Sequence, residues 1–106
     1  MNYVQNMVSA LIWSDRAADE YEKLQSYLYQ EWGEIITQRV INDITQNITR
    51  IQNSPEQFPF FYKTKKIRRC VVSPQTSIFF RFTSERIEIA SIFDNRQNPK
   101  KLRKLK

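Results

Sequence analysis

A single glycine divides the first half of the chain into two helical patterns, and this division constrains the fold more than any other feature. Gly33 is the only glycine among 106 residues. Before it, apolar residues recur at helical spacing over residues 15–32, and Ser14 and Asp15 offer an N-cap. After it, a second amphipathic helix is expected from about residue 34 to the Asn53-Ser54-Pro55 stop. Because only one or two residues join them, the two helices are predicted to form an antiparallel hairpin.

The apolar stripes of these helices define the expected core. The first helix contributes Ala17, Ala18, Tyr21, Leu24, Tyr27 or Leu28, and Trp32. The second contributes Ile36 or Thr37, Val40, Ile41, Ile44, Ile48 and Ile51. We assign both tryptophans, Trp13 and Trp32, to the core rather than to a ligand site.

Four other segments have the composition of strands. They are residues 8–13, 66–73, 77–83 and 86–94. Short turns separate the last three, so these are predicted to form an antiparallel meander. The segment between the hairpin and the meander, residues 57–64, is predicted to be a loop. It carries the aromatic residues Phe58, Phe60, Phe61 and Tyr62.

Alternation along the last two strands predicts which side chains the hairpin covers. One face carries Ile78, Phe80 and Phe82 from the middle strand, and Ile87, Ile89 and Phe93 from the last. The opposite face carries Arg81, Arg86, Glu88 and Asp94, and the two acids are expected to pair with Arg81 or Arg86. The whole chain, residues 1–106, is predicted to be one α+β domain of order β-α-α-β-β-β. Its helical hairpin packs on one face of a small antiparallel sheet, and a basic tail follows from residue 95.

Positive charge is concentrated in the second half of the chain. Residues 1–61 hold four Lys and Arg against eight Asp and Glu, a formal −4, whereas residues 62–106 hold thirteen against three, a formal +10, which together give +6. A field of this size attracts phosphate or acidic protein. The predicted binding residues are Lys63, Lys65, Lys66, Arg68, Arg69, Arg81, Arg96, Lys100 and Lys101. The alternative is that these residues only keep an exposed sheet face and edge soluble.

The composition excludes several kinds of chemistry. The chain has no histidine, which removes Ser-His-Asp and Cys-His nucleophiles and the commonest zinc sites. One cysteine, Cys70, permits no intrachain disulfide and is expected to be an inert core residue. A lone glycine rules out Gly-rich phosphate loops. We therefore predict no metal, no cofactor and no small-molecule substrate. Without a segment long enough for a signal sequence or a membrane span, we expect a cytoplasmic protein with no membrane partner.

The remaining polar residues exclude one catalytic arrangement and permit another. Glu88 and Asp94 are too far apart along one strand to act together as a carboxylate pair. Arginine and lysine can still stabilise a phosphoryl transition state, as in the cleavage of RNA by its own 2′-hydroxyl. If the protein is a ribonuclease, the candidates for this role are Lys66, Arg69, Arg81 and Arg96.

Several segments in order resemble the RelE/ParE toxin superfamily over about residues 8–102. They are Ile12-Trp13-Ser14, the stretch from Tyr27-Leu28 to Trp32-Gly33, Ser54-Pro55-Glu56, and the strand sequences at 67–72, 78–82 and 86–99. The resemblance implies the toxin of a type II toxin–antitoxin pair, held inactive by an acidic, partly disordered antitoxin. RelE-like members cut messenger RNA on the ribosome, whereas ParE-like members poison DNA gyrase.

Departures from the ribonuclease pattern favour the ParE-like subgroup. RelE-like ribonucleases look to have an arginine at the position where this chain has Ser77. They also have a tyrosine, or a histidine and a tyrosine, near the C-terminus, and this chain has neither after Phe93. Arg96 does match their basic residue after the last strand, and Lys66, Arg68 and Arg69 are candidates for the earlier ones. The long hairpin looks like that of ParE-like members. Gyrase inhibition is therefore the favoured prediction, with a ribosome-dependent mRNA endonuclease or a non-toxic RNA-binding module as alternatives.

Overall fold

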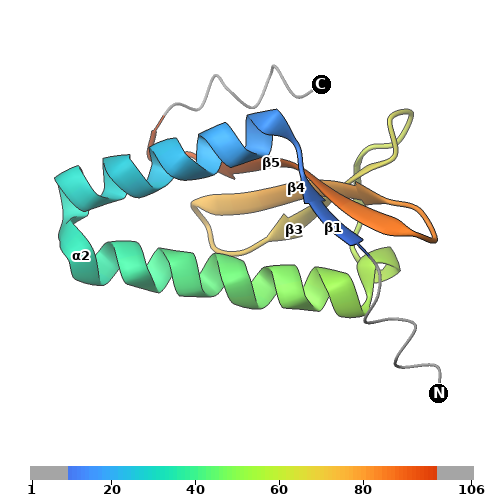
Figure 1. The fold of residues 1–106 in the computed structure, drawn as a ribbon, viewed down its shortest axis with the longest axis horizontal. Helices are drawn as coiled ribbons and strands as arrows, with labels where there is room; N and C mark the ends of the chain where they lie inside the picture. The colour runs from blue at the N-terminus through green and yellow to red at the C-terminus, as the bar shows by residue number, and fades with distance from the viewer. Residues whose placement is uncertain (1–9, 98–106) are drawn as a thin grey trace.

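The computed structural model describes residues 10–97 and confirms the predicted α+β fold. Figure 1 shows a long helical hairpin packed against a sheet. The sheet has five strands in the order β1-β5-β4-β3-β2. The elements are β1 (Ala10–Trp13), α2 (Asp15–Asn53), the short 3₁₀ helix η1 (Pro55–Gln57), β2 (Phe60–Tyr62), β3 (Ile67–Val71), β4 (Thr76–Phe82) and β5 (Arg86–Asp94).

The predicted hairpin is confirmed, with its bend at the glycine. Gly33 has φ 84° and ψ 176°, which separates α2 into two arms that run antiparallel from the bend in Figure 1. The Ser14 hydroxyl accepts a hydrogen bond of 2.9 Å from the Ala17 N–H and so caps the first arm. The second arm ends at Ser54, whose N–H donates to the Arg50 carbonyl just before a proline.

Most of the predicted core is confirmed. Both arms bury one apolar stripe against the sheet. The centre of the resulting core consists of Leu24, Leu28, Ile44 and Ile51 from the arms and of Cys70, Ile78 and Phe80 from the sheet. Burial raises the pKa of the Cys70 thiol, and nearby Arg50 opposes this only in part, so the thiol stays protonated in the core.

Two predicted core positions in the first arm are wrong. Trp32 is 54% exposed and Ala18 is also exposed. Figure 1 shows the reason for Trp32, because the bend projects beyond the ends of the strands and no sheet lies beneath it. Trp13, by contrast, is partly buried and its ring lies 5.1 Å from that of Tyr21.

The sheet is larger and less uniform than predicted. The meander β3-β4-β5 is antiparallel as expected, but β1 pairs with β5 in parallel, so the sheet is mixed. The hairpin carries the chain back across the sheet, which permits this parallel pairing. Part of the expected loop at 57–64 is a strand, since β2 pairs with β3. Pro59 concealed this strand, but proline is tolerated at its start and its carbonyl accepts from the Arg69 N–H.

One extra residue in β5 changes which side chains face the hairpin. Phe79 pairs with Ser91 and Phe80 pairs with Ile89, which leaves Ala90 unpaired as a β-bulge. Beyond it, Ile92 takes the place in the main core that alternation assigned to Phe93. The prediction for Phe93 was wrong for this reason, since its ring packs with Ile67 and Phe79 in a second cluster on the other side of the sheet.

The start of α2 satisfies the polar atoms around this bulge. The Ser14 hydroxyl donates to the Ala90 carbonyl at 2.9 Å, and the Ser14 N–H donates to the Ile89 carbonyl at 2.9 Å. The buried Glu20 carboxylate accepts from the Ser91 hydroxyl at 2.6 Å and from the Ile92 N–H at 3.1 Å. The helix N-terminus and the bulge therefore hold each other in place.

Replacing the glycine should strain the bend. A Cβ at Gly33 would meet nothing within 4 Å, so any cost of Gly33→Ala comes from the backbone conformation alone. That region is almost exclusive to glycine, and we expect a loss of about 1–3 kcal/mol in the free energy of unfolding, measured in urea. Gln30→Ala on the exposed surface of the first arm is the control. Equal stability of the two variants would contradict this account.

Candidate functional site

The side of the sheet away from the hairpin carries much of the predicted basic surface. By alternation from Ile78 and Phe80, which pack under the hairpin, the following side chains point away from it: Arg69, Val71, Ser77, Phe79, Arg81, Arg86 and Glu88. We call this set the open face. It is less open than predicted, because Phe61 and Tyr62 of β2 pack against the second apolar cluster, which includes the fully buried Phe79.

Arg69 is fixed at the centre of the open face. Its Nε donates to the Ser77 hydroxyl at 3.0 Å. Its guanidinium carbon lies 5.7 Å from the centre of the Phe79 ring and 6.0 Å from that of Phe61, within the range of cation–π attraction. Ser77, the position where the ribonuclease pattern has arginine, is therefore a buried partner of another arginine.

A second group of cations surrounds a depression at the end of the open face. Arg81 donates through Nε to Glu88 at 2.7 Å, which confirms the expected pairing of this acid. The depression has a volume of about 320 Å³, and its lining residues are Lys65, Lys66, Arg81, Phe82, Thr83, Arg86 and Glu88. We call it the basic pocket. Sequence reasoning placed Arg86 on the correct face but left it out of the binding set.

Arg68 belongs to the other side of the sheet and has a structural role. It pairs across the ladder with Phe80, and it donates to the carbonyls of Phe58 at 2.6 Å and Glu56 at 3.1 Å. Its guanidinium carbon lies 4.0 Å from the centre of the Phe60 ring. The side chain therefore ties η1 and the start of β2 to the sheet.

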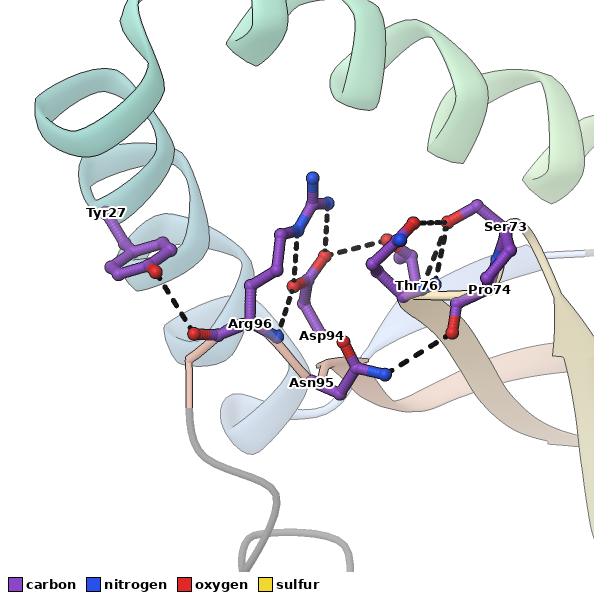
Figure 2. A network of polar contacts seen from close by, with 8 residues as sticks. Tyr27, Ser73, Pro74, Thr76, Asp94, Asn95 and Arg96 are labelled. Atoms are coloured by element: carbon purple, nitrogen blue, oxygen red, sulfur yellow. Dashed lines mark hydrogen bonds and ion pairs between the residues drawn. The ribbon is translucent and has the colours of Figure 1, made fainter.

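Arg96 is also engaged inside the structure. Figure 2 shows its guanidinium against Asp94, with Nε to Oδ1 at 2.9 Å and the terminal nitrogen to Oδ2 at 2.6 Å. The Thr76 hydroxyl donates to the same carboxylate at 2.7 Å, and the Tyr27 hydroxyl donates to the Arg96 carbonyl at 3.0 Å. The predicted pairing of Asp94 with Arg81 or Arg86 was wrong, because the bulge turns Asp94 to the hairpin side.

This ion pair shifts the titration of both groups. Burial would raise the pKa of the Asp94 carboxyl, but the hydrogen bonds from Arg96 and Thr76 outweigh it and hold the pKa below its ordinary value. The hydrogen bond to Asp94 in turn raises the pKa of Arg96. The Asp94 side chain is fully buried and that of Arg96 is 21% exposed, so this arginine stabilises the end of β5.

The remaining predicted residues lie apart from these groups. Lys63 is exposed in the turn between β2 and β3, where its carbonyl accepts from the Lys66 N–H. Lys100 and Lys101 lie outside the described residues. Within residues 10–97 no three His, Cys, Asp or Glu residues come close enough to hold a metal ion. In the same range no helix is long and apolar enough to cross a membrane.

Comparison with known proteins decides the family. A family profile described as the ParE toxin of the type II toxin–antitoxin system parDE matches residues 11–99, which is most of the chain. The chain belongs to the ParE toxin family. No curated protein sequence matches it. This ParE-family chain is accordingly a toxin of a type II toxin–antitoxin system, and such a toxin has a cognate antitoxin as its partner.

Solved structures share the fold of this ParE-family toxin at low sequence identity. The chromosomal ParDE system from P. aeruginosa matches with a TM-score of 0.69 and 18% identity, over 82% of this chain and 96% of the other. A YoeB/ParE toxin from Agrobacterium tumefaciens matches with a TM-score of 0.57 and 15% identity, over 80% of this chain and 96% of the other. These matches support the fold.

Neutralising Asp94 should destabilise the ParE-family toxin in a pH-dependent way. Asp94→Asn leaves Arg96 without its counter-charge, and we expect the free energy of unfolding to fall by about 2–3 kcal/mol at pH 7. Because the folded pKa of Asp94 is lowered, its charge stabilises the fold above the unfolded pKa of about 3.9, and this stabilisation is lost as pH falls through the folded value. The difference in unfolding free energy between the wild type and Asp94→Asn, measured in urea, should therefore become smaller below about pH 4. A difference that is constant from pH 7 to pH 3 would contradict this role.

Removing Arg68 should destabilise the fold more than removing Arg81, because Arg68 has a structural role and Arg81 lies on the surface. Arg68→Ala removes two hydrogen bonds and two ring contacts, and we expect it to cost about 2 kcal/mol of unfolding free energy. Arg81→Ala removes only an exposed ion pair and should cost about 0–1 kcal/mol. Thermal unfolding of both variants measures this order, and its reversal would overturn the assignment.

Proposed function

We propose that this toxin arrests growth by inhibiting DNA gyrase, with the open face as its contact surface. The target-contacting residues are Arg69 and Arg81, which project from one side of the sheet. Residues on such a surface set partner choice and association rate through their charge.

One observation carries the preference for gyrase over RNA cleavage. A ribonuclease mechanism would draw on Lys66, Arg69, Arg81 and Arg96 together. Arg96 is instead bound to the buried Asp94 on the hairpin side of the sheet, while Lys66 and Arg81 line the basic pocket on the other side. The four cations therefore do not converge on one phosphate, and the chain has no histidine to move a proton.

The ribonuclease remains the second candidate, for a specific reason. Arg69 lies over Phe61 and Phe79, and Arg81 and Lys66 flank a nearby pocket. Cations beside aromatic rings are a common platform for single-stranded RNA. This arrangement supports RNA contact but includes no histidine to move a proton.

We propose that the antitoxin is acidic and meets the same positive half of the toxin. The formal charge of +10 on residues 62–106 favours a negatively charged partner. The coding region next to the toxin gene is the place to find this protein. Its co-expression should restore growth.

The purified toxin should inhibit gyrase-catalysed DNA supercoiling. We expect Arg69→Gln/Arg81→Gln to weaken inhibition by about tenfold, the scale for losing a central interface contact. Arg39→Gln, an exposed position on the second arm of α2, should leave inhibition unchanged.

Programmed ribosomes provide the opposing test. Codon-specific cleavage of mRNA that Arg96→Ala abolishes would overturn the gyrase proposal and select the endonuclease. Growth that continues during high expression of the toxin would contradict both mechanisms.

A further inference from the structure

The lining of the basic pocket has more positive than negative charge. Four cations line it, Lys65, Lys66, Arg81 and Arg86, against the single carboxylate of Glu88. That carboxylate is already paired with Arg81 at 2.7 Å. The formal charge of the lining is therefore +3, and the salt bridges among residues 10–97 include none to the other three cations.

Two tight turns place these cations. Lys66 has a left-handed backbone with φ 58°, and its N–H donates to the Lys63 carbonyl at 3.0 Å. Across the pocket, the Thr83 hydroxyl accepts from the N–H groups of Glu85 and Arg86 at 3.2 and 3.3 Å. The Thr83 N–H also donates to the Arg86 carbonyl at 2.9 Å. The turns bring cations from two separate connections to one position before any ligand binds.

We infer that the basic pocket binds a phosphodiester group of nucleic acid. Lysine and arginine side chains at such a site are the usual partners of phosphate oxygens. The volume of about 320 Å³ is at the lower end of ligand-sized pockets and fits one phosphate with part of its sugar. This site goes beyond the proposed action on gyrase, because it contacts nucleic acid rather than the target protein.

The sheet geometry favours nucleic acid over an acidic peptide at this position. The pocket lies over β4 and β5, and both strands already have a neighbour on each side. A peptide cannot add there as a further strand. Phe82 is the only apolar side chain in the lining, so an amphipathic helix would find no groove for its anchors. Side-chain contacts to a phosphate backbone need neither feature.

The test measures binding of the intact toxin to a short fluorescent DNA duplex by anisotropy at several salt concentrations. The pocket variant is Lys66→Asn/Arg86→Gln, in which asparagine suits the left-handed backbone. The control variant is Lys23→Gln/Arg39→Gln, which removes the same charge from α2. We expect the pocket variant to bind at least about tenfold more weakly, with a shallower salt dependence by about one unit of slope, and the control to stay within about twofold of wild type.

Three results would overturn the inference. An equal loss of DNA affinity in the pocket variant and the control variant would mean that only the overall electrostatic field of the toxin matters. If the toxin binds a glutamate-rich peptide but not DNA, and the pocket variant loses this peptide binding, the pocket belongs to a carboxylate partner. Unchanged DNA binding by a folded pocket variant would place the contact elsewhere.

Lys65→Gln is a second, single variant in case the double variant does not fold. Supercoiling inhibition is scored separately, so a toxin that binds DNA through this pocket without inhibiting gyrase contradicts the gyrase proposal alone.

Discussion

The bulge at Ala90 is the constraint on which the arrangement of this toxin depends. It inserts one residue into β5 and exchanges the two faces of the strand beyond it. The exchange is maintained by Ser14 and Glu20 from the first turns of α2, which satisfy the backbone and side-chain groups around the bulge. The hairpin and the sheet edge are therefore connected by polar contacts as well as by the apolar core.

This exchange divides the arginines into two groups with different roles. Asp94 turns under the hairpin and binds Arg96, so the end of β5 is held to Tyr27 and Thr76. Arg68 is used in the same structural way beneath η1. Arg69 and Arg81 remain on the open face, Arg69 beside the rings of Phe61 and Phe79 and Arg81 in the lining of the basic pocket. Fewer cations are therefore available to a target than the net charge of the chain suggests, because some of the arginines stabilise the fold.

The family and the mechanism rest on different kinds of evidence. The ParE toxin family follows from a match along most of the chain and agrees with a fold shared at low identity. The choice of gyrase is our proposal, and it depends on where a few side chains lie. A fold of this kind supports more than one activity, so the mechanism has to be argued from the site. The sheet separates Arg96 from Arg81 and Lys66, and this separation is the main structural argument for gyrase inhibition over RNA cleavage.

The sequence by itself determined the elements that depend on local periodicity. Gly33 between two apolar stripes predicted the hairpin, and the short turns predicted the meander. Alternation predicted that Glu88 pairs with Arg81 or Arg86, and its partner is Arg81. Tertiary structure decided what no local pattern encodes. The Ala90 bulge forms because α2 supplies partners from residues more than 70 positions away in the chain. The exposure of Trp32 depends on where the sheet ends beneath the bend. The partners of Asp94 and Arg96, and hence the composition of the candidate site, followed from these long-range contacts.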